Sequence, residues 1–200
     1  MSNLLVQNIK HTNGTTAVTV DTSGRMTRPN TPLVAVRSTN LSYFGTNHSS
    51  TTYDISYRSP LPTFTSGYRT TIANQGGGTL SFESYAGGEY PKYVVPITGL
   101  YEYTFYGGLR LHSNQAGDWA AMGIYVNSAT IDSSGSLDFI GSVIQVYNPQ
   151  DAIDDVQANM SFTLQLSLSA NDYIVVAQQS TGQSAFNDSG SHGFSLKFIG

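Results

Sequence analysis

Apolar and polar residues alternate with a period of two in the second half of this chain. Three aromatic residues, Tyr101, Tyr103 and Phe105, are separated by polar ones, and the same alternation recurs at residues 161–169 and 194–198. Because successive side chains of a strand point to opposite faces, each segment predicts a strand with one apolar face turned inward. No window shows a long helical period, so the sequence predicts an all-β fold.

Turn residues divide the remainder of the chain into further short strands. Residues 119–126, 143–147 and 173–177 are strand candidates, and residues 33–37 predict the opening strand of the main domain. Turns are expected at Gly107-Gly108 and at residues 133–135, 148–149 and 171–172. Residues 150–158 are compatible with one or two helical turns. Seven or more short strands at this spacing predict a sandwich or jelly roll.

Residues 38–78 are rich in Ser, Thr, Asn, Gly and Tyr, which predicts long loops with one or two short strands. Ordered loops of that length are uncommon and are usually functional. Tyr among Ser, Gly and Asn is also the composition of adaptable recognition loops. The candidate recognition surface is Tyr43, Phe44, Tyr53, Tyr57 and Tyr68. The alternative is that these rings cover the sandwich or fill an interface between copies of the chain.

The N-terminal residues predict an arm that is separate from the main domain. Residues 4–9 and 16–20 read as two short strands around an Asn13-Gly14 turn, and Pro29 and Pro32 follow. We therefore expect an arm and linker over residues 1–32 and one domain over residues 33–200. A ribbon this short is marginal alone in water, so it needs a partner surface. The apolar residues expected to make the attachment are Leu4, Val6, Ile9, Val18 and Val20.

Composition excludes several kinds of function. The 200 residues allow one well-cored domain, and charged residues make up only 11% with a net charge of -4, so no basic surface for nucleic acid is expected. The absence of Cys excludes disulfides, zinc ribbons and thiol catalysis, and no cofactor is expected. The N-terminus has no basic leader with a long apolar run, and no segment reaches membrane-spanning length, so we expect cytosolic synthesis without membrane insertion.

Two groups of residues are candidate catalytic sites. Residues 187–190 resemble the loop around a serine-protease nucleophile, with His11, His48 or His112 as the base, but Ser191 replaces a required Gly. We favour a loop before the last strand, with His192 at its rim. Glu83 and Glu89 are conceivable as the paired carboxylates of a glycosidase. Nothing else in the sequence supports that activity, and we expect no enzyme.

Asp151, Asp154 and Asp155 are the candidate ligands of a metal ion, because calcium takes carboxylate oxygens from loops. They lack the alternate spacing and the Gly of a calcium-binding loop, so a solvated polar loop is the favoured interpretation.

Four segments resemble the complement C1q and tumour necrosis factor jelly-roll superfamily. In residues 93–103 the matching positions are Tyr93, Pro96, Gly99, Tyr101 and Tyr103, where Tyr103 replaces the usual Phe. Residues 124–127, 166–174 and 191–196 follow in the family's order, with Ser128 and Asn171 in place of Gly. The last two segments contribute Asp172, Gly193 and Phe194. The resemblance implies a jelly-roll sandwich whose inner sheets pack in a homotrimer about a threefold axis.

Residues 13–26 resemble the leader of tail-fibre, head-fibre and decoration proteins of bacterial viruses. The resemblance implies a virion structural protein, made in the host cytoplasm without a signal peptide. Its arm would bind other virion proteins of the capsid or tail. The expected role is capsid decoration, as a cement protein, or a short fibre knob. The alternatives are a receptor-binding tail-fibre tip that recognises a host surface glycan or protein, a polysaccharide depolymerase, and a free ligand-binding C1q-like domain.

Overall fold

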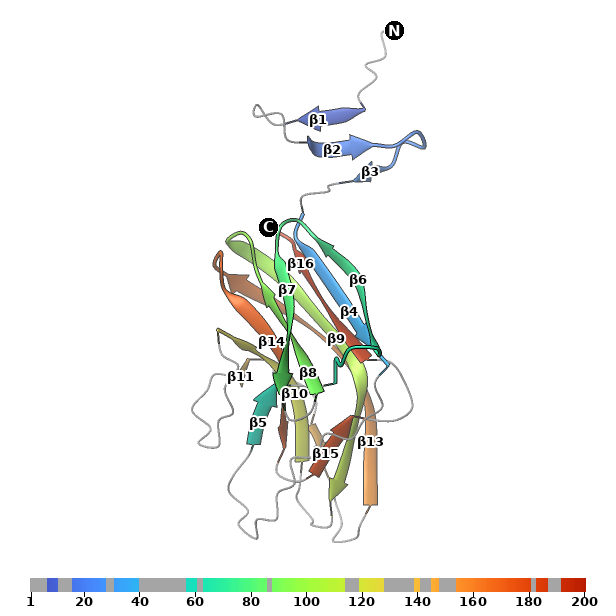
Figure 1. The fold of residues 1–200 in the computed structure, drawn as a ribbon, viewed down its shortest axis with the longest axis vertical. Coiled ribbons are helices and arrows are strands. Elements are labelled where there is room, and N and C mark those ends of the chain that lie inside the picture. The colour runs from blue at the N-terminus through green and yellow to red at the C-terminus, as the bar shows by residue number, and fades with distance from the viewer. Residues whose placement is uncertain are drawn as a thin grey trace.

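The computed structural model describes residues 7–10, 16–27, 31–39, 57–60, 63–85, 88–113, 119–127, 139–140, 145–147, 154–180, 183–186 and 192–200. These residues form strands and turns without a helix. Two sheets pack face to face, and a small third sheet lies beyond one end of them (Figure 1). The strands are β1 (Asn8–Lys10), β2 (Thr16–Val20), β3 (Met26–Thr27), β4 (Leu33–Ser38), β5 (Tyr57–Pro60), β6 (Arg69–Gln75), β7 (Thr79–Tyr85), β8 (Gly88–Val94), β9 (Gly99–Ser113), β10 (Trp119–Val126), β11 (Phe139–Ile140), β12 (Gln145–Tyr147), β13 (Asp154–Leu168), β14 (Tyr173–Ser180), β15 (Gln183–Phe186) and β16 (His192–Phe198).

The two large sheets have the connectivity of a jelly roll. The six-stranded sheet has the order β13-β9-β16-β4-β6, with β15 paired to β9. The seven-stranded sheet has the order β11-β10-β14-β8-β7, with β12 paired to β10 and β5 to β14. The last strand, β16, thus lies between β4 and β9, so strands far apart in the sequence are neighbours in space. The predicted fold class, an all-β jelly-roll sandwich with an N-terminal β arm, is confirmed.

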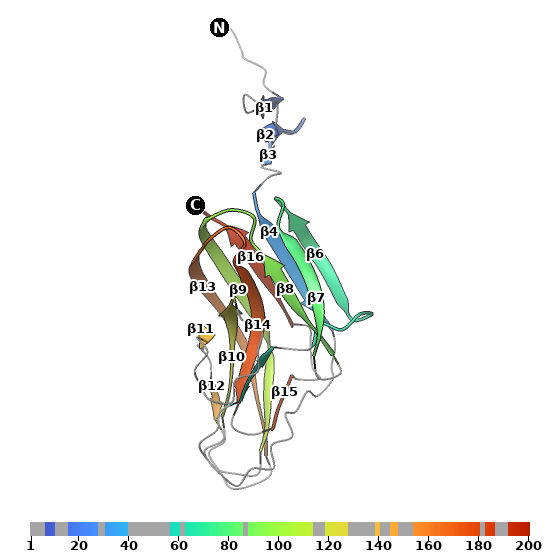
Figure 2. The same ribbon diagram turned by 60° about the vertical axis from the view of Figure 1, so that its left-hand side comes forward.

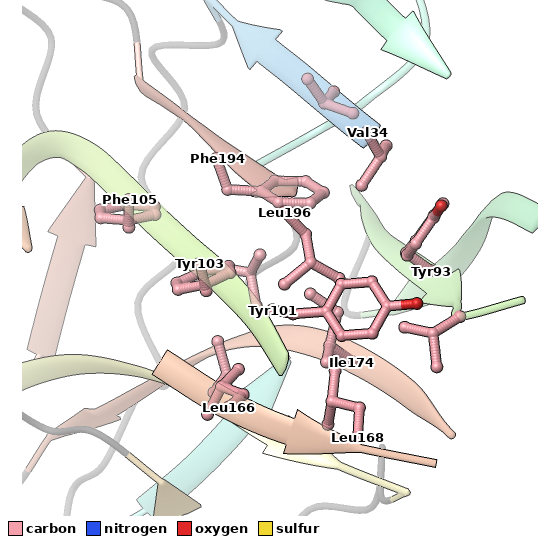
Figure 3. Packing of buried hydrophobic residues seen from close by; sticks show 14 of the residues in the cluster. Val34, Tyr93, Tyr101, Tyr103, Phe105, Leu166, Leu168, Ile174, Phe194 and Leu196 are labelled. Atoms are coloured by element: carbon pink, nitrogen blue, oxygen red, sulfur yellow. The ribbon is translucent and has the colours of Figure 1, made fainter. Parts of the chain in front are cut away.

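The core lies between the two sheets and is filled by the residues that alternate in the sequence. Tyr101, Tyr103 and Phe105 of β9 are fully buried, and β16 contributes Phe194 and Leu196 to the same layer (Figure 3). On the other face of the six-stranded sheet, the hydroxyls of Thr104 and Thr163 lie 3.1 Å apart in a hydrogen bond. The period-two prediction is therefore confirmed for β9, β13 and β16.

The turn predicted at Gly107-Gly108 is wrong, because β9 continues through both residues from Gly99 to Ser113. Gly107 is needed for a close approach instead. A Cβ added there would lie 2.7 Å from the Cβ of His192 and 3.2 Å from the ring of Phe105. A glycine within a strand often marks such a close contact.

The helical turns predicted near residues 150–158 are wrong for the part that the structure describes. Residues 154–158 belong to β13, which pairs with β9 from Asp154 opposite Ser113 to Leu168 opposite Gly99. The long antiparallel ladder overrides the local preference of these residues. Residues 150–153 lie outside the described residues. The prediction of one or two short strands within residues 38–78 is confirmed by β5 and β6.

Three turns are joined at the end of the sandwich from which the arm leaves. The carboxylate of Asp172 accepts hydrogen bonds from the Ser169 amide and from Asn127 Nδ2, each at 2.7 Å, and its carbonyl accepts one from the Val95 amide. The Tyr173 amide in turn donates to Asn127 Oδ1 at 3.0 Å. Asn127 and Asn171 have positive φ angles of 56° and 74°. Asn is the residue type other than Gly that adopts this region most readily, which is why Asn171 substitutes for Gly.

Candidate binding surfaces

The arm is a three-stranded sheet of order β1-β2-β3 beyond the end of the sandwich, as two views of the molecule agree (Figures 1 and 2). Its register pairs Ile9 with Val18 and Val20 with Met26. Paired residues and residues two apart in a strand share a face, so these four apolar residues lie together. Ile9 is 51% exposed and Met26 70% exposed. The arm therefore presents an apolar face, defined by these four residues, to solvent.

The opposite face of the arm sheet is polar. It carries Asn8 and Thr19, and the Thr19 hydroxyl donates a hydrogen bond of 3.1 Å to Asn8 Oδ1. The arm sheet is thus amphipathic, although it is only three strands wide.

A turn built on Asp21 adds the third strand, β3, which was not predicted. Asp21 Oδ1 accepts hydrogen bonds from the Ser23 and Arg25 amides, and Oδ2 accepts one from Arg25 Nε at 2.7 Å. The Arg25 amide and then its guanidinium lower the pKa of Asp21. Gly24 has a φ of 78°, which a residue with a side chain rarely adopts. The turn brings Met26 opposite Val20. Residues 21–24 are themselves a turn signal in the sequence, so what was missed is only the short strand that begins at Met26.

The structure describes only some of the predicted attachment and recognition residues. Ile9, Val18 and Val20 share the apolar face of the arm, whereas Leu4 and Val6 lie outside the described residues. Tyr43, Phe44 and Tyr53 also lie outside them. Tyr57 begins β5 at the edge of β14, and Tyr68, in the turn before β6, is 55% exposed. The recognition surface as a whole therefore stays a prediction, with Tyr68 as its exposed member.

The residues of the jelly-roll signature lie in the core and in the turn that leads to it. Tyr93, Tyr101, Tyr103 and Phe194 are buried. The Tyr101 hydroxyl donates to the Ile97 carbonyl at 2.8 Å, which fixes the turn that contains Pro96. The two signature glycines allow close approaches. An added Cβ would lie 2.4 Å from the Phe198 ring at Gly99, and 2.4 Å from the Val36 carbonyl at Gly193.

Two core hydroxyls, those of Tyr93 and Tyr103, have no hydrogen-bond partner among the residues that the structure describes. Burial raises the pKa of Tyr93 to about 12 and that of Tyr103 well above 10. The core therefore contains buried hydroxyls whose loss of water is not offset by a hydrogen bond within the described residues.

The expectation that His192 is a rim residue is wrong, because its side chain is only 2% exposed. His192 pairs with Ser38 of β4, and it shares the inward face of β16 with Phe194 and Leu196. Its Nε2 lies 2.6 Å from Thr63 Oγ1 in a buried hydrogen bond, and its ring packs edge-on against Phe64 at 5.1 Å. Burial lowers the pKa of His192 to about 4. The sequence could have indicated this burial, because His192 precedes Phe194 by two positions and so lies on the same inward face of β16.

Residues 63–69, here called the clasp, connect the two large sheets. On the side of the six-stranded sheet, the Ser38 hydroxyl donates to the Thr63 carbonyl at 2.6 Å, next to the His192 contact. On the side of the seven-stranded sheet, the Phe64 amide donates to the Glu89 carbonyl at 2.9 Å. Phe64 itself is fully buried between them. The clasp thus holds β4 and β16 to β8.

Arg69 and Glu89 close the clasp with an ion pair at 2.5 Å. Arg69 also donates to the Phe64 carbonyl at 3.0 Å, and its guanidinium lies 3.7 Å above the ring of Phe82. Glu89 accepts a second hydrogen bond, from the Ser66 amide, at 2.7 Å. Both contacts are made by Glu89 Oε2, which joins β8 to the clasp.

Glu83 and Glu89 do not form the carboxylate pair of a glycosidase. Glu83 lies opposite Tyr90 in the ladder of β7 and β8, whereas Glu89 lies opposite Ser84, so the two carboxylates face opposite sides of the sheet. Glu83 accepts hydrogen bonds from the Tyr90 hydroxyl at 2.6 Å and from Lys92 Nζ at 3.0 Å. These two contacts, in that order, lower the pKa of Glu83.

The other candidate sites lie partly outside the described residues. Asp154 and Asp155 begin β13, whereas Asp151 is not described, so the calcium site stays untested. Residues 187–190, His11 and His48 are not described either. Within the described ranges, no three His, Cys, Asp or Glu side chains gather as metal ligands. No helix able to span a membrane occurs in that part of the chain.

Comparison with known proteins gives a likeness of fold. No family model matches the sequence. No curated protein matches it either. Among solved structures, the Eiger TNF from S. frugiperda superposes with a TM-score of 0.43 at 12% identity, over 84% of this chain and 94% of that one.

Proposed function

We propose that this chain is the trimeric jelly-roll head of a bacterial-virus particle, a capsid decoration or cement protein or a short fibre knob, anchored by its N-terminal arm. The observation that carries the proposal is the amphipathic arm sheet, with Ile9 and Met26 exposed at 51% and 70%. β1 and β3 are only three and two residues long, so the arm sheet has little paired backbone of its own, and an apolar face of this kind is stabilised by docking on another protein. The resemblance of residues 13–26 to virion leaders supports a virion protein as that partner.

The trimer rests on the resemblance to the C1q and tumour necrosis factor superfamily. The outward face of the six-stranded sheet supports it, since it is lined by short polar side chains such as Thr104, Thr163 and Ser195, with Tyr106 37% exposed among them. Short side chains on this face would let three copies approach closely around an axis. Three arms on one trimer would raise the effective concentration at the particle, so each single contact can be weak.

The test is binding to particles that lack this protein. A truncated chain of residues 31–200 omits the arm but keeps Pro32, whose carbonyl accepts a hydrogen bond from the Phe198 amide at 2.9 Å. We expect the truncated chain to fold and form trimers but not to bind particles, whereas the full chain binds. Equal binding of both chains would assign the attachment to the jelly roll and would refute the role of the arm.

A receptor-binding fibre tip is the second candidate function, favoured by the exposed ring of Tyr68. Exposed Tyr among Ser, Thr and Gly suits contact with a glycan or protein at the host surface. Binding of the full chain to host cells, lost in Tyr68→Ala and retained in Ile9→Asn, would favour this role.

A further inference from the structure

The clasp packs against an ionisable ring, that of His192, in a buried joint between the two sheets. Thr63 bridges to Glu89 of β8 and contacts Ser38 of β4 and His192 of β16, and 129 residues separate Thr63 from His192 in the sequence. Removal of the clasp from this joint would separate β8 from β4 and β16 at this point. The protonation state of the His192 ring therefore affects whether β8 stays joined to β4 and β16 here.

The described groups that contact His192 are hydroxyl-bearing, glycine and aromatic residues, and an ion pair lies nearby in the same joint. β4 contributes the Ser38 hydroxyl, β9 contributes Gly107, and β16 contributes Phe194. The charged groups of the joint are Arg69 of the clasp and Glu89 of β8, and they bind each other. Arg37, next to Ser38, is exposed on the other face of β4. A positive imidazolium in this position would be desolvated beside an aromatic ring, which is unfavourable.

We propose that the clasp is an acid-labile latch: protonation of His192 releases residues 63–69 from the joint while the rest of the sandwich remains folded.

The direction follows from linkage. His192 has a pKa of about 4 in the closed state, and an exposed histidine has one near 6.5, so the open state binds more protons between these values. The closed clasp is fully favoured above pH 6.5, and this preference is lost as the pH falls toward 4. From pH 7 to pH 5, the opening equilibrium should rise roughly 20-fold.

Hydrogen exchange of the full chain tests the latch at pH 7 and pH 5, after correction for the intrinsic exchange rate. The reporter amides are those of Phe64 and Ser66, which donate from the clasp to Glu89, of Tyr68, which donates within the clasp, and of Thr39, which donates to it. The reference amides are in the β9–β16 ladder, such as those of Phe105 and Phe194. We expect the reporters to open roughly 20-fold more at pH 5 and the reference amides to show no such rise. Equal change in both sets, or none in the reporters, would overturn the proposal.

Two variants separate the histidine from the carboxylate. His192→Gln keeps a hydrogen-bonding side chain without a titrating group, so its reporter amides should lose the pH dependence. Glu89→Gln weakens the ion pair with Arg69, so its reporter amides should open more at both pH values, but they should keep the pH dependence because His192 is unchanged. A dependence that survives His192→Gln or disappears in Glu89→Gln refutes the latch. If His192→Gln does not fold, an NMR titration of the wild-type imidazole decides. In that case, the exchange of the reporter amides must rise at a higher pH than the one at which the imidazole of the closed state becomes protonated.

Discussion

The ring of Tyr106 lies against Gly193 of the neighbouring strand, where an added Cβ would be 2.7 Å from the Tyr106 hydroxyl. One residue along the same pair of strands, and on the inward face, His192 lies against Gly107 in the reverse arrangement. Each strand thus contributes a glycine where the other contributes a ring. These two close contacts explain why Gly107 and Gly193 occur within continuous strands, and the one at Gly107 leaves room for the buried His192.

Gly193→Ala should destabilise the sandwich by roughly 1–3 kcal/mol, the usual cost of overpacking a well-packed site. The added Cβ would lie 2.4 Å from the Val36 carbonyl, and backbone cannot move aside as a flexible side chain can. Chemical denaturation measures the change. Gly200→Ala is the control, because an added Cβ there meets nothing within 4 Å. Equal stability of the two variants would contradict the close-approach account of Gly193.

Tyr103→Phe should stabilise the protein by roughly 1 kcal/mol, because it removes a buried hydroxyl with no hydrogen-bond partner among the described residues. The matched control is Tyr101→Phe, which removes the hydrogen bond to the Ile97 carbonyl and should cost about 1 kcal/mol. Unfolding by denaturant distinguishes the two signs. A loss of stability in Tyr103→Phe would show that its hydroxyl is bound.

Asp172 and Asn127 should be energetically coupled, since Asn127 Nδ2 donates to Asp172 Oδ1 and the two residues join three turns. Asp172→Ala should cost roughly 1–3 kcal/mol, as for a polar network broken at one member. A double-mutant cycle with Asn127→Ala should give a coupling of about 0.5–3 kcal/mol. Strict additivity of the two substitutions would exclude the network.

The protein should unfold cooperatively at alkaline pH. The folded-state pKa of Tyr93 is raised to about 12 and that of Tyr103 well above 10, both by burial. Their contribution to stability is complete below pH 10, the unfolded pKa, and is lost as the pH rises above it, because the unfolded state releases protons first. The tyrosinate absorbance that arises from the buried rings should therefore appear together with the loss of circular dichroism above pH 10. Tyrosinate formation complete by pH 11 with an intact dichroism spectrum would contradict this.

The apolar face of the arm should carry particle binding. Ile9→Asn combined with Met26→Asn should abolish association with particles, because it makes the exposed apolar face polar. Thr19→Asn changes the opposite face and should retain binding. Neither change should shift the melting temperature of the sandwich, which can be followed by calorimetry. Undiminished binding by the double variant would exclude docking through this face.

Several features of this protein follow from local sequence because they depend only on strand geometry. The period-two pattern predicts which side of β9, β13 and β16 is buried, since successive side chains must alternate between faces. The same reasoning places Ile9 and Val18 on the arm, and a tight-turn residue type explains Asn171. No contact between distant segments is needed for any of these inferences.

Tertiary structure decided the features that depend on which segments meet. Gly107 belongs to a strand because it pairs with Met160 of β13, and residues 154–158 are extended because β9 pairs with them. The register of β7 and β8 separates Glu83 from Glu89 across the sheet. The burial of His192 against Thr63 depends on the return of the chain to the joint between the sheets. Sequence pattern records the local period of a strand, whereas register and partner arise from the packing of the whole chain.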